Sequence, residues 1–169
     1  VIEEQPHKEN IKKFLRAIEI SKEIELENIE ELINGKYEID RSEIIETIQA
    51  GREKLVSIQG NAGSGKSVVC KKLLKGKEYV LVTRAENLST GKKVNELWDC
   101  DVEDAILWLE NKPLYIFIDA IEFIADCGDN AFTLLQEIYR LADKYSNVYI
   151  ITSCRTTDSS AFMKINTKY

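Results

Sequence analysis

Apolar residues recur along the chain in two patterns, one with the spacing of a helix and one continuous over several residues. Stripes of helical spacing predict helices at residues 8–18, 68–74, 102–110 and 132–142. Continuous apolar runs predict strands at residues 55–58, 79–83, 114–118 and 148–152. Because strands and helices alternate with short connections, the sequence predicts an α/β fold in which helices sandwich a parallel sheet.

Further helical signals precede the first predicted strand. Residues 18–26 mix alternating apolar residues with glutamates and lysines, which favours a helix with a break or turn near Ser21. Another apolar stripe ends near Gly35, a residue suited to a helix C-terminus. We therefore expect residues 1–36 to form an N-terminal helical extension and residues 37–169 to form the core.

A short helix is expected between this extension and the first strand. Asp40 followed by Glu43 is a capping-box pattern, which marks a helix N-terminus. Ile44, Ile45 and Ile48 then follow at helical spacing. The pattern predicts that these three side chains form the buried side of the helix.

The connection after the first predicted strand carries the pattern G-x-x-x-x-G-K-S, from Gly60 to Ser67. Gly60, Gly63 and Gly65 allow backbone conformations closed to other residues, so successive amides can converge on one phosphate. The helix that follows directs its positive dipole end toward the same anion. Lys66 would reach the β- and γ-phosphates, and the Ser67 hydroxyl would hold Mg²⁺. The alternative is a flexible Gly/Ser connection, but the strand before the pattern and the helix after it predict a P-loop.

The third predicted strand, residues 114–118, ends in Asp119. In a parallel sheet, ligands bind at the edge formed by the carboxyl ends of the strands. Asp119 would there accept the Mg²⁺-bound waters and fix the metal opposite Ser67. Glu122, three residues on, is the candidate for orienting or deprotonating an attacking water. The alternative is that Asp119 only caps the following helix.

Thr152-Ser153-Cys154-Arg155 stands at the end of the fourth predicted strand, residues 148–152. An arginine near a transferring phosphoryl group is a recurrent device, so Arg155 is a candidate sensor of the γ-phosphate. The alternative is an exposed or salt-bridged side chain.

Composition narrows the range of functions. With 169 residues, 44% of them hydrophobic, the chain is long enough for one domain with a sizeable core. The net charge of -6 argues against direct nucleic-acid binding, which draws on a basic surface. The four cysteines stand far apart in sequence, as expected for unpaired thiols and not for a zinc site. No apolar run reaches membrane-spanning length and no signal peptide begins the chain, so a cytoplasmic location is expected.

These motifs together resemble the STAND branch of P-loop NTPases, in particular its NACHT-like members, which are related to the AAA+ ATPases. The resemblance covers about residues 37–155. Asp119-Ala-Ile-Glu122 is similar to the Walker B form of the family, and Ile151-Thr-Ser-Cys-Arg155 is similar to its strand-end Thr-Ser-Arg, with Cys154 intervening. Ile39-Asp-Arg41 resembles the box that borders the adenine. The resemblance also implies that the fourth strand lies between the P-loop strand and the Walker B strand.

The resemblance assigns a role to each site residue. It implies that Lys66, Glu122 and Arg155 are catalytic and that Ser67 and Asp119 hold the metal. The nucleotide would be bound by Arg41, Gly60, Asn61, Ala62, Gly63, Ser64, Gly65, Lys66, Ser67 and Val68. ATP and Mg²⁺ are the expected cofactors, since no guanine-reading N/T-K-x-D motif is present.

The expected function is the ATP-binding, slowly hydrolysing core of a STAND-like regulatory switch. Expected partners, besides ATP and ADP, are flanking effector and sensor domains of a longer chain and further copies in a nucleotide-dependent homo-oligomer. The chain starts at a valine and stops before the helical lid and winged helix of the family, as expected for a truncated core. Two alternatives stay open: a small-molecule or nucleoside kinase, and an oligomerisation module that has lost hydrolysis.

Overall fold

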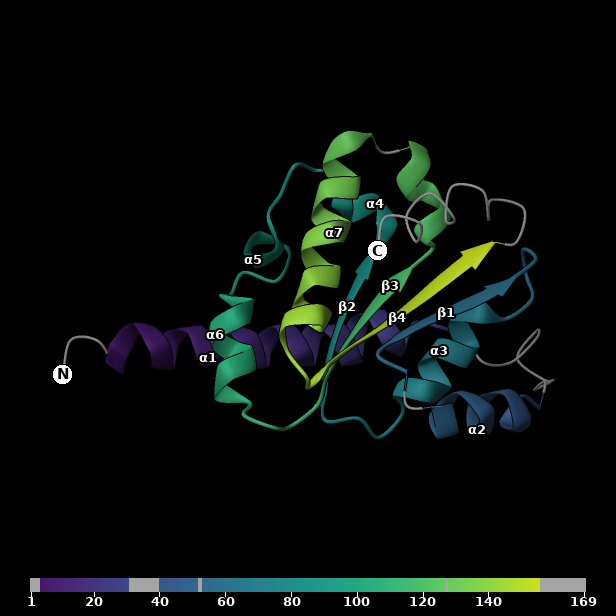
Figure 1. The fold of residues 1–169 in the computed structure, drawn as a ribbon, viewed down its shortest axis with the longest axis horizontal. Coiled ribbons are helices and arrows are strands. Elements are labelled where there is room, and N and C mark those ends of the chain that lie inside the picture. Colours follow the sequence, from purple (N-terminus) through teal and green to yellow (C-terminus); the bar gives the residue numbers. More distant parts are fainter. Residues whose placement is uncertain (1–3, 31–39, 52, 127, 156–169) are drawn as a thin grey trace.

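The structure is a computed structural model that describes residues 4–30, 40–51, 53–126 and 128–155 (Figure 1). Among these residues, four parallel strands form one sheet in the order β1-β4-β3-β2. They are β1 (Leu55–Gly60), β2 (Tyr79–Arg84), β3 (Leu114–Asp119) and β4 (Val148–Arg155). The predicted α/β class with a parallel sheet is confirmed, and β4 lies between β1 and β3, as the resemblance implies.

Helices flank the sheet on both faces. The helical segments are α1 (Glu4–Ile20), the π-helical η1 (Ser21–Leu26), α2 (Ser42–Gly51), α3 (Lys66–Leu74), α4 (Ala85–Leu88), α5 (Val94–Leu97), α6 (Val102–Trp108), the 3₁₀ segment η2 (Ile121–Asp126) and α7 (Asp129–Lys144). One core cluster joins one face of the sheet to α1, α6 and α7, and a second joins the other face to α3 and α2. Side chains alternate along each strand, so Ile116 faces the first cluster and Phe117 the second.

The N-terminal segment packs into the core and shields the edge of β2. Phe14 of α1 is fully buried and stacks on Tyr79, with ring centroids 6.3 Å apart. The backbone N of Val82 donates to Ser21 Oγ at 3.0 Å, and Trp98 Nε1 donates to the Val82 carbonyl at 3.2 Å. These bonds satisfy backbone groups that an edge strand leaves unpaired. The expected break near Ser21 takes the form of a change from α- to π-helix.

Three details differ from the expectations, and a fourth expectation is not tested. Ile44 is 47% exposed, because α2 packs against α3 through the face that carries Ile45 and Ile48. Residues 84–99 lack an apolar period, which predicts a loop with one short helix, but the structure has two one-turn helices there, α4 and α5. The helix expected to end near Gly35 lies largely outside the described residues. β4 continues three residues beyond its predicted end, because residues 153–155 pair with β1.

Two further findings concern composition. The described cysteines, Cys70, Cys100 and Cys154, are free and buried, and burial raises the pKa of the Cys100 thiol to about 11. Within the described ranges, no helix combines the length and the apolar character needed to cross a membrane.

Candidate functional site

The glycine-rich connection between β1 and α3 forms a tight loop at the carboxyl edge of the sheet. Gly63 and Gly65 adopt left-handed backbone conformations, with φ of 72° and 78°. A Cβ atom on Gly60 would lie 2.5 Å from Ser64 Oγ, so a side chain at this position would disturb the loop. The Ser64 backbone N donates to the Asn61 carbonyl at 3.1 Å, which closes the turn. Gly63 and Gly65 therefore serve the backbone path, as the sequence predicted, whereas Gly60 is not among the glycines with positive φ and its role is to leave space for Ser64.

Two basic side chains brace this loop. Lys66, the first residue of α3, donates from Nζ to the Asn61 carbonyl at 2.9 Å. Arg41, just before α2, donates from Nη2 to the Ser64 carbonyl at 2.5 Å. The Arg41 guanidinium also lies 3.0 Å from the place where a Cβ of Gly65 would be. Arg41 and Lys66 thus add positive charge to a loop that precedes the positive end of the α3 dipole.

Asp119 lies at the end of β3, directly opposite the start of α3. Ser67 Oγ donates to Asp119 Oδ1 at 3.0 Å. Ser153 Oγ donates to the same oxygen at 2.5 Å and accepts from the backbone N of Ala120 at 2.7 Å. The structure therefore brings the two predicted metal-binding residues into contact across 52 positions of sequence.

Ser153 was not among the residues predicted for the site. It belongs to the segment Thr152-Ser153-Cys154-Arg155, in which only Arg155 was predicted to have a role, as a sensor of the γ-phosphate. Ser153 is 1% exposed, and it shares the α3 side of the sheet with Asp119, as strand alternation requires. A serine at the end of an apolar run was the signal available in the sequence.

Glu122 lies on η2, the 3₁₀ segment that follows β3. Ala120, between the two acids, has a φ of 58°, and this left-handed residue turns the chain from the strand into η2. The Glu122 side chain is 6% exposed, and its Oε1 lies 3.2 Å from Arg155 Nε. Its Oε2 is buried and has no hydrogen-bond partner among the described residues. The structure thus brings Glu122 together with the predicted sensor arginine.

Arg155 ends β4 on the same side of the sheet as Ser153. Cys154, the intervening residue, points into the opposite cluster and is 1% exposed. Strand alternation therefore directs two successive α3-side residues of β4 toward the two acids. The Arg155 side chain is 45% exposed, and its Cζ lies 5.7 Å from the centroid of the Phe123 ring. Of the alternatives for Arg155, the salt bridge is present.

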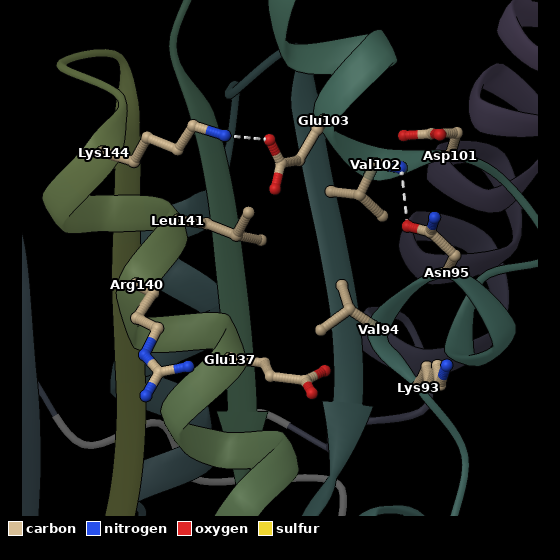
Figure 2. Close-up of a pocket in the computed structure, with 10 residues that line it drawn as sticks. All are labelled: Lys93, Val94, Asn95, Asp101, Val102, Glu103, Glu137, Arg140, Leu141 and Lys144. Atoms are coloured by element: carbon tan, nitrogen blue, oxygen red, sulfur yellow. Dashed lines mark hydrogen bonds and ion pairs between the residues drawn. The ribbon is translucent and has the colours of Figure 1, made fainter.

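A separate pocket of about 500 Å³ lies between α7 and the segment from α5 to α6 (Figure 2). Figure 2 shows Lys144 of α7 paired with Glu103 of α6 across this pocket. Lys144 and the hydroxyl of Tyr145 both donate to this carboxylate, and these bonds hold the pKa of Glu103 below its usual value. The described lining includes none of the residues predicted for the site.

Comparison of the chain with protein-family models and with curated proteins gives no match. The functional assignment therefore depends on the sequence motifs and on the geometry of the loop and the two acids.

Proposed function

We propose that this chain is the nucleotide-binding core of a STAND-like regulatory NTPase that binds Mg-ATP and hydrolyses it slowly. The observation that carries the proposal is the contact between Ser67 and Asp119, at 3.0 Å, where the glycine-rich loop meets the end of β3. This contact supports the proposal because it joins the two predicted metal-binding motifs at the carboxyl edge of a parallel sheet, where such folds bind ligands.

The loop between Gly60 and Ser67 fits a phosphate chain. Left-handed glycines at 63 and 65 turn the backbone so that amide groups can point into one concavity. The crowding at Gly60 agrees with a tight loop, because a Cβ there would displace the Ser64 hydroxyl. Lys66 would exchange its bond to the Asn61 carbonyl for the β- and γ-phosphate oxygens.

Ser67 and Asp119 fit Mg²⁺ by donor chemistry, because both supply oxygen, which Mg²⁺ prefers. Ser67 Oγ would hold the metal, and Asp119, whose Oδ1 lies 3.0 Å from Ser67 Oγ, would accept the Mg²⁺-bound waters. The described residues contain no group of three or more His, Cys, Asp or Glu side chains that could hold a metal, so phosphate oxygens of the nucleotide and water molecules would complete the coordination. Bound Mg²⁺ would offset the charge of the phosphates.

Glu122 is the residue that would take a proton from the attacking water. The water oxygen bonds to the γ-phosphorus, the bond from that phosphorus to the bridging oxygen breaks, and ADP leaves with the electron pair. The proton of the water passes to the Glu122 carboxylate. Arg155 Nε lies 3.2 Å from Glu122 Oε1 and so occupies one oxygen of the carboxylate that would orient the water, and we therefore expect slow turnover.

Phosphate release is the assay that separates this proposal from the alternatives. A kinase would transfer the γ-phosphate to a small-molecule acceptor faster than to water. A module without hydrolysis would bind ATP and release no phosphate. In the proposed NTPase, Glu122→Gln abolishes phosphate release while ATP binding is retained.

The test of nucleotide binding is a titration of Mg-ATP against wild type, Lys66→Ala and Lys75→Ala. Lys66→Ala should reduce affinity to below detection, because the lysine that contacts the phosphates is lost. Lys75, an exposed lysine directly after α3, is the matched control, because its loss changes the net charge equally at the far end of the same helix. Lys75→Ala should bind as wild type does. ATP affinity that survives Lys66→Ala would refute the proposal.

A further inference from the structure

The ion pair between Glu122 and Arg155 occupies the carboxylate that hydrolysis would need. We propose that Arg155 exchanges between two partners, the Glu122 carboxylate and the terminal phosphate of bound ATP, and so acts as a latch on Glu122. While Arg155 is paired with Glu122, the guanidinium occupies the carboxylate and Glu122 cannot act on the water. When the terminal phosphate binds Arg155 instead, the ion pair breaks and the Glu122 carboxylate becomes available. This inference rests on the proposed function and adds to it the way in which the site is regulated.

The two members of the pair differ in freedom. The Glu122 side chain is 6% exposed and lies on a 3₁₀ turn whose entry is set by the left-handed Ala120. The Arg155 side chain is 45% exposed and rests against Phe123, with 5.7 Å between Cζ and the ring centroid. The acid is therefore fixed, and the guanidinium is the member that can move.

The Glu122 carboxylate is also incompletely satisfied. Arg155 Nε approaches Oε1, whereas Oε2 is buried without a hydrogen-bond partner among the described residues. A buried carboxylate oxygen that lacks a donor carries a desolvation cost that no contact offsets.

Arg155 lies at the end of β4, beside the glycine-rich loop where the terminal phosphate of ATP would bind. In the parallel register, Arg155 pairs with Gly60, the residue where β1 passes into the glycine-rich loop. A guanidinium forms bidentate bonds with phosphate as readily as with carboxylate. Arg155 can therefore pair either with the Glu122 carboxylate or with the γ-phosphate, which ATP has and ADP lacks.

The exchange has a consequence for binding that does not depend on catalysis. If Arg155 must leave Glu122 to contact the γ-phosphate, the two anions compete, and binding of ATP is opposed by Glu122. Binding of ADP is not opposed, because it has no γ-phosphate. The ratio of ATP affinity to ADP affinity therefore reports the latch.

The experiment measures Kd for Mg-ATP and for Mg-ADP, by calorimetry, in wild type, Glu122→Gln, Arg155→Met and the double variant. Glu122→Gln should raise the ratio of ATP affinity to ADP affinity at least about fivefold, the lower end of typical coupling. Arg155→Met should lower the ratio, and Glu122→Gln should then have no further effect. Arg155→Lys should restore part of the ratio, because it keeps the cation. Arg140→Met, an exposed arginine of α7, is the control and should leave the ratio unchanged.

The outcomes separate the latch from the proposed function. If wild type binds no nucleotide, or if binding survives Lys66→Ala, the proposed function is wrong and the latch, which depends on it, is wrong as well. If binding depends on Lys66 but Glu122→Gln changes the ratio equally with and without Arg155, the latch is wrong and nucleotide binding stands. A purely structural ion pair would shift the melting temperature and leave the ratio unchanged, which also refutes the latch.

Discussion

Replacing Ser153 with alanine tests how the acidic end of β3 is held in place. The Ser153 hydroxyl donates to Asp119 Oδ1 at 2.5 Å and accepts from the backbone N of Ala120 at 2.7 Å. Ser153 is 1% exposed, so water does not readily replace either bond in the variant. The alanine also leaves the backbone N of Ala120 without this partner, at a residue whose φ is 58°.

The two bonds set the size of the effect. A hydrogen bond to a charged group contributes about 1.5–3 kcal/mol and a neutral one about 0.5–1.5 kcal/mol, so Ser153→Ala should destabilise the fold by roughly 2–4 kcal/mol. With a urea m-value of about 2 kcal/mol/M, the unfolding midpoint should fall by roughly 1–2 M. Circular dichroism at 25 °C, without added nucleotide, measures this shift directly.

Thr152→Val provides the matched control on the same strand. Thr152 is fully buried, but its Oγ1 has no hydrogen-bond partner among the described residues. Removing a buried hydroxyl that makes no bond is neutral or stabilising, because its desolvation cost is also removed. Equal losses in the two variants, or a loss below about 1 kcal/mol in Ser153→Ala, would show that the Ser153 bonds do not hold the acids.

Two further substitutions test the loop and the edge of the sheet. Gly65→Ala and Gly63→Ala both place a side chain at a φ above 70°, which costs about 1–2 kcal/mol, but only the former meets a neighbour, the Arg41 guanidinium at 3.0 Å. In urea titrations Gly65→Ala should therefore lose more stability than Gly63→Ala, and equal losses would contradict the bracing role of Arg41. Trp98→Phe removes the bond from Nε1 to the Val82 carbonyl and should cost about 0.5–1.5 kcal/mol in the same assay; no measurable loss would mean that this bond does not stabilise the edge of β2.

The sheet could be predicted because its strands are local features. Each strand is a short apolar run bounded by polar or turn residues, and Leu114 to Ile118 is buried almost throughout, as expected for the interior of a parallel sheet. The glycine pattern likewise depends on backbone geometry within eight residues. Such features need no knowledge of distant parts of the chain.

The remaining features depend on contacts between residues far apart in sequence. The apolar run did not show that β4 would extend to Arg155, because Ser153 and Arg155 are polar and the strand end is held by pairing with β1. Ile44 was expected to be buried because it has helical spacing, but the side of α2 that packs is decided by where α3 lies. Ser153 was missed for the same reason, since its role depends on Asp119, 34 positions earlier.

β4 is the element that links the parts of the candidate site. It pairs with β1, which leads into the glycine-rich loop, and with β3, which ends in Asp119. Its two last α3-side residues each hold one acid, Ser153 the Asp119 carboxylate and Arg155 the Glu122 carboxylate. A movement of the end of β4 would therefore change the distance between the loop and both acids at once.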